Sequence, residues 1–120
     1  MTCEDFLIVE DNELNQKIFK AFLKQKGYSF QVAGNGVEAV QKMKDCKFKV
    51  ILMDLRMPVM DGIECTKFIR KRISKSVPVI GVSANSEAEM ECITAGMNDF
   101  VSKPLSPQKV NYICDNWVLS

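Results

Sequence analysis

The sequence predicts an α/β fold, a doubly wound parallel sheet of five strands with five helices on its two faces. Three observations lead to this prediction. Short apolar runs alternate with segments of helical periodicity along the chain, as in strand–helix–strand units. The runs are bounded by polar residues, glycine or proline, and several are almost continuously hydrophobic, as in strands covered on both faces. No repeat or linker interrupts the 120 residues, so we expect one domain over 1–120.

The apolar runs define the expected strands. The first, third and fourth runs are the most continuous and suit the centre of the sheet, and the fifth is the weakest. Strict alternation with helical crossovers implies that all five strands are parallel. The expected strands are Phe6–Val9, Phe30–Ala33, Val50–Met53, Val77–Val82 and Phe100–Val101.

The expected helices lie after each of these runs. The first follows Asn12 and ends at Gly27, and the next three follow Asn35-Gly36, Asp61-Gly62 and Asn85. The last begins at Ser106-Pro107, a serine N-cap followed by proline. In the first helix the predicted buried stripe is Leu14, Ile18, Ala21 and Phe22. In the last it is Val110, Ile113, Cys114 and Trp117.

Composition excludes several classes of protein. The 16 Lys and Arg residues balance 15 Asp and Glu residues, which argues against a dedicated nucleic-acid or membrane-surface domain. The basic stretch between Lys67 and Lys75 is interpreted as a solvated helix face. No apolar run has the length of a membrane span, and the first ten residues lack the basic start of a signal peptide. We therefore expect a cytoplasmic domain that binds neither nucleic acid nor membrane.

The cysteine and histidine content limits the kinds of catalysis and metal binding that this chain can support. The chain has five cysteines, an odd number, and none of them forms a C-x-x-C motif. We therefore expect the cysteines to be small core residues of a protein in a reducing compartment. The chain has no histidine. This excludes Ser-His and Cys-His catalysis, histidine metal sites and a phosphohistidine carried by this chain. Any phosphoryl donor must therefore be another molecule.

Polar residues follow four of the expected strands where these strands end. The first is followed by Glu10-Asp11, the third by Asp54, the fourth by Ser83-Ala84 and the fifth by Lys103-Pro104. The carboxyl ends of parallel strands meet at one edge of the sheet, where ligands bind in such folds. A single acid at a strand end is usually a helix cap, but capping does not explain four such strands.

This combination of side chains suits phosphoryl transfer. Clustered carboxylates repel one another unless a cation is present, and without histidine or thiolate ligands Mg²⁺ or Mn²⁺ fits better than zinc. The carboxylate of Asp54 can act as a nucleophile and form an acyl phosphate. The metal and Lys103 could neutralise the transferring group, and Ser83 could hydrogen-bond a phosphoryl oxygen.

The segment Val50–Gly62, VILMDLRMPVMDG, resembles the phosphoacceptor region of two-component receiver (response regulator) domains. Glu10-Asp11-Asn12, Ser83-Ala84 and Lys103-Pro104 stand in the matching places, so the resemblance covers nearly the whole chain. Asn15-Gln16 and the segments 33–40 and 95–100 resemble receivers attached to hybrid histidine kinases.

The resemblance implies a role for each site residue. Asp54 matches the phosphorylated aspartate, and Ser83 and Lys103 match the hydroxyl and the lysine that contact the phosphoryl group. Ser83 and Phe100 match the pair of switch residues. The implied metal ligands are Glu10, Asp11, Asp54 and the backbone carbonyl of Arg56.

The resemblance also implies a flavodoxin-like receiver fold with strand order 2-1-3-4-5 and a cis peptide at Lys103-Pro104. Helices 1 and 5 would cover one face of the sheet, and helices 2, 3 and 4 the other. The implied function is phosphorelay signal transduction. The domain would accept a phosphoryl group on Asp54 from a histidine kinase or a histidine-containing phosphotransfer protein. Phosphorylation would then change a partner-binding surface made by helix 4, strand 5 and helix 5.

Such a domain is a phosphoacceptor rather than an enzyme, although it assists its own phosphorylation and dephosphorylation, and we expect a monomer or weak dimer. Three alternatives are less favoured. A haloacid-dehalogenase-like phosphatase usually has a second Asp two residues after its nucleophile, where this chain has Arg56. A flavodoxin would need a Ser-, Thr- and Gly-rich first turn, which is Glu10-Asp11-Asn12-Glu13 here. A receiver that signals without phosphate would not need the complete set of site residues.

Overall fold

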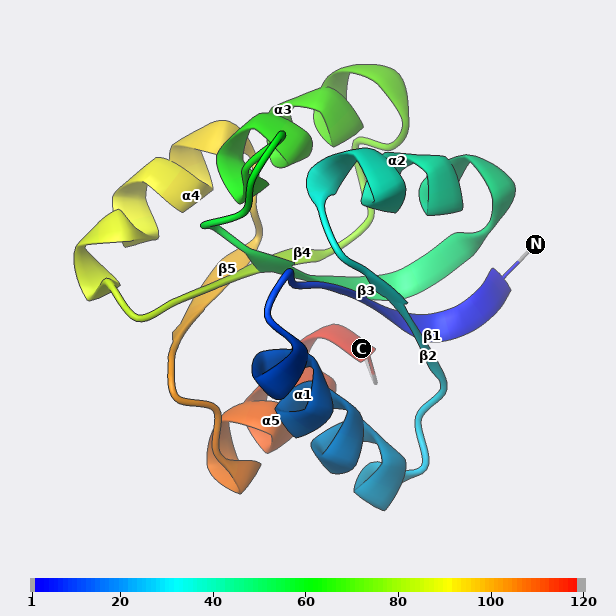
Figure 1. Cartoon of the computed structure of the whole chain (residues 1–120), viewed down its shortest axis with the longest axis vertical. Helices are drawn as coiled ribbons and strands as arrows, with labels where there is room; N and C mark the ends of the chain where they lie inside the picture. Colours follow the sequence, from blue (N-terminus) through cyan, green and yellow to red (C-terminus); the bar gives the residue numbers. More distant parts are fainter. Residues whose placement is uncertain (1, 119–120) are drawn as a thin grey trace.

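The computed structural model describes the backbone of residues 2–118 and the side chains of residues 4–118. It contains a five-stranded parallel sheet with the order β2-β1-β3-β4-β5, as predicted (Figure 1). The strands are β1 Thr2–Val9, β2 Phe30–Ala33, β3 Lys47–Asp54, β4 Val79–Ser83 and β5 Asp99–Ser102. The helices are α1 Glu13–Lys26, α2 Gly36–Asp45, α3 Gly62–Arg72, α4 Glu89–Ala95 and α5 Pro107–Ile113. A 3₁₀ turn, Ser86–Ala88, precedes α4, and a π-helical turn, Cys114–Val118, follows α5.

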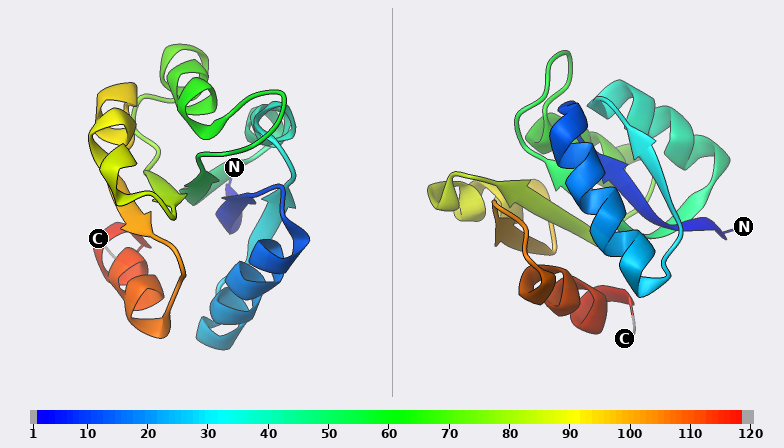
Figure 2. Two further views of the ribbon diagram at one scale, coloured as in Figure 1. Left: turned by 60° about the vertical axis from the view of Figure 1, so that its left-hand side comes forward. Right: turned by 60° about the horizontal axis from the view of Figure 1, so that its bottom comes forward.

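The sheet lies between two layers of helices (Figures 1 and 2). α1 and α5 cover one face, where Phe19 and Ile113 pack in a core cluster with Phe6 of β1. α2, α3 and α4 cover the other face, where a second cluster includes Val40 and Ile69. The predicted assignment of helices to the two faces is therefore confirmed.

Local sequence explains where most elements begin. Asn12, Asn35, Asp61 and Ser106 each accept a hydrogen bond from the backbone N–H three residues later. The predicted N-cap at Ser106 is therefore confirmed, and the other three residues cap the helices that were predicted to follow them. β1 and β3 start earlier than expected. β4 starts at Val79 rather than Val77, after Pro78, which has no N–H to contribute to the sheet.

The predicted buried stripe of α1 is wrong except at Phe22, which is partly buried and packs against a core cluster. Phe19 and Leu23 are the buried residues of this helix, whereas 67% of the Leu14 side chain and 38% of Ile18 are exposed. Two apolar rows overlap in this segment, and the one through Phe19 faces the sheet. α1 therefore presents apolar side chains to solvent.

The last helix follows its predicted pattern more closely. Val110, Ile113 and Cys114 are buried, and Trp117 lies partly buried in the π-helical turn. The indole Nε1–H of Trp117 donates to Oδ2 of Asp99 at 3.0 Å, and the Tyr112 hydroxyl donates to the same oxygen at 2.6 Å. These bonds tie the C-terminal end of the chain to the start of β5.

The cysteines only partly follow the prediction. Cys65, Cys92 and Cys114 are buried free thiols. Burial raises the pKa of Cys65 to about 12 and that of Cys92 to about 11, so both are unreactive packing residues. Cys46 is disulfide-bonded, so the expectation of reduced cysteines is wrong for this residue. The side chain of Cys3 lies outside the described residues.

Gly62 brings α3 close against the end of β3. Its N–H donates to the carbonyl of Leu55 at 3.0 Å. A Cβ atom at Gly62 would overlap the carbonyl oxygen of Asp54 and lie 2.9 Å from Cα of Leu55. These contacts are with backbone, which cannot move aside as a side-chain tip can.

Replacing Gly62 with alanine should therefore lower the free energy of unfolding by about 3 kcal/mol, because α3 must move away from the end of β3. Urea denaturation followed by circular dichroism measures this loss. Gly34→Ala is the matched control, since a Cβ there would meet only Glu38 Oε2, at 3.6 Å. Equal effects of the two substitutions would contradict the close-packing argument.

Candidate functional site

The polar residues that follow the strands surround one hollow of about 340 Å³ at the carboxyl edge of the sheet. It is lined by Glu10, Asp11, Asn12, Asn15, Asp54, Arg56, Ser83, Ala84, Asn85 and Lys103. The structure thus brings together every predicted site residue except Phe100.

Lys103 connects the ends of four strands. It follows β5, and its ammonium group donates to Oε1 of Glu10 at 3.0 Å and to Oδ1 of Asp54 at 3.3 Å. Its backbone N–H donates to the carbonyl of Ser83 at 2.9 Å. The peptide bond between Lys103 and Pro104 is cis, as expected.

The two acids that Lys103 contacts are buried. Only 1% of Glu10 and 5% of Asp54 is exposed. Burial and the neighbouring charge of Asp54 raise the pKa of Glu10 to about 7, against the opposing effect of Lys103. Burial alone would lower the pKa of Lys103, but its bonds to Glu10 and Asp54 outweigh this and the pKa is raised. The site therefore holds more negative charge than one lysine compensates.

Backbone groups fix the orientation of the acids and the hydroxyl. The N–H of Asn12 donates to Oε2 of Glu10 at 3.3 Å, and the N–H of Arg56 donates to Oδ1 of Asp54 at 3.4 Å. The Ser83 hydroxyl accepts from the N–H of Asn85 at 3.1 Å. Oδ1 of Asp54 accepts both the Arg56 and the Lys103 bonds, and Oδ2 accepts neither.

The acids are close enough to bind a metal ion. One carboxylate oxygen each from Glu10, Asp11 and Asp54 lies within 4.8 Å of the others. Asp11 is exposed, so a cation can approach from solvent. Oxygen ligands of this kind suit a hard divalent cation, and such a cation would relieve the repulsion that raises the pKa of Glu10.

The loop after Asp54 contains a residue with a strained backbone. Val59 has φ of 71°, in the left-handed region that a β-branched residue rarely adopts. The N–H of Met60 donates to the carbonyl of Pro58 at 2.8 Å, which makes Val59 the central residue of a γ-turn. The side chain of Val59 is 83% exposed.

Phe100 lies beside the hollow rather than in it. It stands opposite Gly81 on the neighbouring strand, and its ring packs against the core cluster beneath α2, α3 and α4. Gly81 lies two residues before Ser83 on β4, so Phe100 and Ser83 are on adjacent strands.

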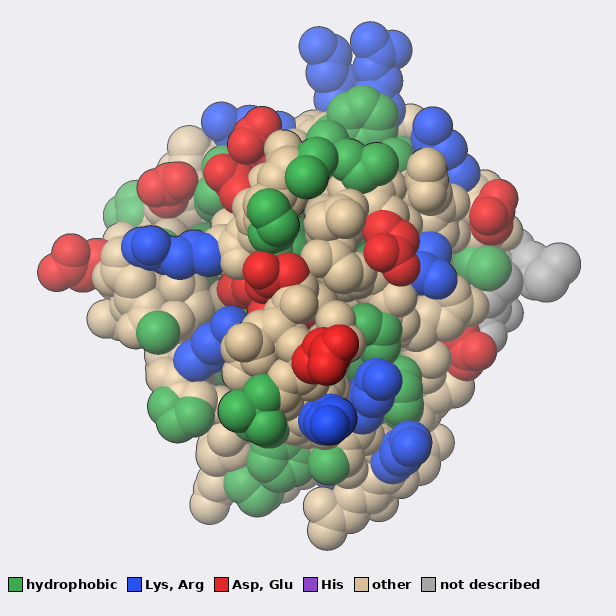
Figure 3. Space-filling model, in the orientation of Figure 1, with side chains coloured by type: hydrophobic (Ala, Val, Ile, Leu, Met, Phe, Trp, Pro, Cys, Tyr) green, Lys and Arg blue, Asp and Glu red, His purple; other side chains and the backbone are tan. Residues whose placement is uncertain are grey.

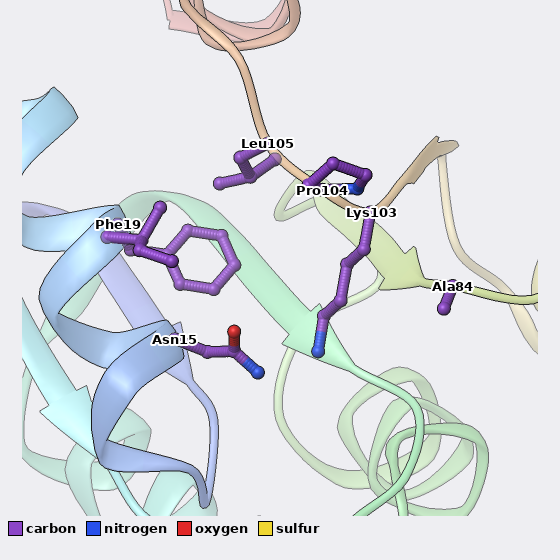
Figure 4. A pocket seen from close by; sticks show the side chains of 7 residues that line it. Asn15, Phe19, Ala84, Lys103, Pro104 and Leu105 are labelled. Atoms are coloured by element: carbon purple, nitrogen blue, oxygen red, sulfur yellow. The ribbon is translucent and has the colours of Figure 1, made fainter.

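A second, mostly apolar pocket of about 220 Å³ adjoins the hollow and also contains Lys103 and Ala84. Figure 4 shows Asn15 and Phe19 of α1 facing Lys103, Pro104 and Leu105 across this pocket. Ile18 also lines it. The sequence pattern does not reveal this pocket, because the predicted buried stripe of α1 includes Ile18. Asn85 was expected only as a helix start, and it also lines the acidic hollow.

Comparison with known proteins identifies the class. Residues 6–114 match the response regulator receiver domain family. The receiver domain of the sensor histidine kinase PA1611 from Pseudomonas aeruginosa, with a magnesium ion in its active-site cleft, is 35% identical, and each chain is covered to 98% with a TM-score of 0.89. The receiver domain of Saccharomyces cerevisiae Ssk1, solved with the histidine phosphotransfer protein Ypd1, is 32% identical with a TM-score of 0.86, over 97% of this chain and 89% of that one.

The chain therefore belongs to the response regulator receiver domain family. It is a receiver of the kind that hybrid histidine kinases and response regulators carry in phosphorelay signalling. Hybrid signal transduction histidine kinase B of Dictyostelium discoideum is 42% identical over 89% of this chain, which spans 6% of that kinase. Within residues 2–118, no helix has the length and apolar character needed to cross a membrane.

The raised pKa of Glu10 predicts how stability depends on pH. The ordinary pKa is 4.5 and the folded value is about 7, so the folded state holds this proton more tightly than the unfolded state. The resulting stability is fully present below about pH 4.5 and is lost as pH rises through about 7. In EDTA, the free energy of unfolding of the wild type should fall by on the order of 1–3 kcal/mol relative to that of Glu10→Gln between about pH 5 and pH 8.

Denaturant unfolding at a series of pH values measures this difference. Glu64→Gln, at an exposed residue in the first turn of α3, is the control and should keep the wild-type pH profile. If Glu10→Gln kept that profile too, the burial argument for Glu10 would be wrong.

Proposed function

We propose that this domain accepts a phosphoryl group on Asp54 from a phosphohistidine of a partner protein and is switched by it. The observation that carries the proposal is the buried carboxylate of Asp54, held by Lys103 at the end of a central strand and facing the hollow that contains Ser83. A buried carboxylate with one oxygen fixed is oriented for attack in a single direction.

The chain's own groups would act on the transferring phosphoryl group. Oδ2 of Asp54 attacks phosphorus, the phosphorus–oxygen bond forms, and the phosphorus–nitrogen bond breaks. The donor's imidazole leaves with the bonding pair as a neutral ring, because its other ring nitrogen carries a proton. The ammonium group of Lys103 lies at hydrogen-bond distance from Asp54 and can shift to a phosphoryl oxygen as charge accumulates there. The Ser83 hydroxyl can donate to another phosphoryl oxygen while it accepts from Asn85.

The acidic cluster supports a magnesium requirement. Glu10, Asp11 and Asp54 would hold the ion, with the backbone carbonyl of Arg56 as a fourth ligand. Their oxygen-only donor set fits Mg²⁺ or Mn²⁺, and the excess negative charge at Glu10 needs a cation. When bound, the ion supplies positive charge that neutralises the phosphoryl oxygens during transfer.

Ser83 and Phe100 would convert phosphorylation into a change of shape. The phosphoryl group adds about −1.5 to −2 charges, which attract the Ser83 hydroxyl and Lys103. Movement of Ser83 opens space beside β4, into which the ring of Phe100 can turn. The surface made by α4, β5 and α5 then differs between the two states and can be read by a partner.

The exposed apolar residues of α1 support docking of the phosphodonor beside Asp54. Leu14 and Ile18 stand on the solvent side of α1, and the pocket that Ile18 lines contains Lys103. An apolar surface next to the acceptor can hold a donor protein while its histidine reaches the hollow. A histidine kinase core or a histidine-containing phosphotransfer protein fits this role. The similar Ssk1 receiver was solved in complex with such a phosphotransfer protein, Ypd1.

In this proposal residues 1–120 form a single receiver domain in the cytoplasm, a monomer or weak dimer that binds no nucleic acid. It acts as a phosphoacceptor that assists its own phosphorylation and dephosphorylation. A phosphatase that turns over phosphate esters is not favoured. The position two residues after Asp54 carries Arg56, whose exposed side chain cannot serve as the second acid.

Asp54→Asn should abolish phosphorylation by acetyl phosphate and Mg²⁺, because the amide lacks the nucleophilic oxygen. The loss of the added mass in intact-protein mass spectrometry measures this. Asp45→Asn, at an exposed aspartate that ends α2, should label as the wild type does. Labelling of Asp54→Asn to the wild-type extent would refute the assignment of the acceptor.

Combined Leu14→Ser and Ile18→Ser substitutions should slow phosphotransfer from a histidine-containing phosphotransfer protein at least about tenfold, since an apolar contact is lost from the docking surface. Their labelling by acetyl phosphate should be unchanged, because a small donor needs no docking. Val37→Ser, at a similarly exposed residue of α2, is the control. A parallel loss with both donors would mean that α1 supports the chemistry instead of docking the donor.

A further inference from the structure

Two connected hollows lie on the α2–α3 side of the molecule. One, of about 630 Å³, lies between the two helices and is lined by Met43, Lys44, Phe68, Arg72 and Ile73. The other, of about 400 Å³, shares Met43 and Ile73 and continues toward Phe48, the second residue of β3. We call the two together the α2–α3 groove.

The floor of the α2–α3 groove is apolar. Met43, Phe68 and Ile73 are only partly buried, and their inner sides pack against the core cluster of this face of the sheet. Their outer sides are available to another molecule. Apolar side chains that line a groove between two helices can accept the apolar face of a third helix.

The rim of the groove is basic. Lys44, Lys47 and Arg72 line the two hollows, and no Asp or Glu is among the described lining residues. These three side chains are exposed and form no ion pair with any residue between 4 and 118. In Figure 3, Lys and Arg side chains stand beside hydrophobic side chains over the end of α3, at the top of the view.

The sequence around the groove also contains many more basic than acidic residues. The segment 67–75, which includes the end of α3, contains five basic residues and no acid. Arg70 is occupied, because its guanidinium donates to the carbonyls of Gly96 and Ser74. Asp45 is the single acid in the segment 42–49. The net charge of the chain is only +1, so positive charge is concentrated here.

We propose that the α2–α3 groove binds an acidic amphipathic helix of a partner protein. The apolar floor would receive the apolar side chains of that helix, and the cationic rim would pair with acidic residues along its edges. A nucleic-acid strand would match the charge of the rim, but its charged backbone would not bury the apolar floor of methionine, phenylalanine and isoleucine. A flat anionic membrane would touch the rim without reaching the floor.

The position of the groove keeps it apart from Asp54. Phe48 lies near the start of β3 and Asp54 ends it, a separation of roughly 20 Å for six extended residues. A helix bound in the groove would leave the acidic hollow and the exposed side of α1 accessible. The proposal does not depend on phosphorylation, and its failure would leave the proposed function untouched.

A capped synthetic helix of about 15 residues, with leucine on one face and glutamate on the other, is the probe for this site. Titration of the ¹⁵N-labelled protein should give saturable shifts at the amides of Met43, Phe68 and Ile73. The affinity should fall at least about tenfold in Lys44→Glu/Arg72→Glu and on raising the salt from about 0.05 M to 0.5 M. Lys17→Glu/Lys24→Glu makes the same change of charge on exposed residues of α1 and should alter the affinity less than about twofold.

A second peptide with serine in place of leucine tests the apolar floor and should not bind. The proposal is wrong if the serine peptide binds equally well, if the shifts fall outside the groove, or if both charge-reversed variants weaken binding alike. It is also wrong if single-stranded DNA or anionic phosphatidylserine vesicles shift the groove amides and the leucine peptide does not.

Discussion

The ion pairs that Lys103 makes with Glu10 and Asp54 organise the functional edge of this domain. Two carboxylates this deeply buried are stable only with a cation beside them, and Lys103 reaches across from the end of β5 to provide it. Its backbone also bonds to the carbonyl of Ser83, so one residue connects the ends of β1, β3, β4 and β5. The parallel register of the sheet is what allows that reach.

The same arrangement leaves the site short of positive charge. The raised pKa of Glu10 shows this shortage, because one ammonium group compensates only part of the repulsion between Glu10 and Asp54. Val59 adds backbone strain in the loop that follows Asp54. Features that reduce stability gather at functional sites, where the same groups are needed for binding and reaction. Here the uncompensated charge favours a metal cation, and in the proposed function a phosphoryl group would bring oxygens to which Lys103 can turn.

Much of the fold and of the convergence of site residues could be predicted from the sequence, because strand ends carry distinct chemistry. Glu10, Asp54, Ser83 and Lys103 each end an apolar run, and a parallel sheet necessarily gathers them. The orientation of α1 could not be predicted the same way. Apolar residues there form two overlapping rows, and periodicity alone does not say which row faces the sheet. The pocket beside Lys103 was missed for the same reason, since it depends on Ile18 pointing outward. The disulfide at Cys46 had no local signal either, because pairing depends on which distant segments meet.

The hydrogen bonds of Asp99 have a consequence for how this domain can be observed. Asp99 precedes Phe100, its Oδ1 accepts from the Phe100 N–H, and its Oδ2 accepts from the indole of Trp117. Trp117 is the only tryptophan in the chain. Its fluorescence and its indole proton resonance therefore report on the contact between β5 and the C-terminal turn without any added label. The molecule thus carries an intrinsic probe that contacts Asp99, the residue next to Phe100, which we propose as part of the switch.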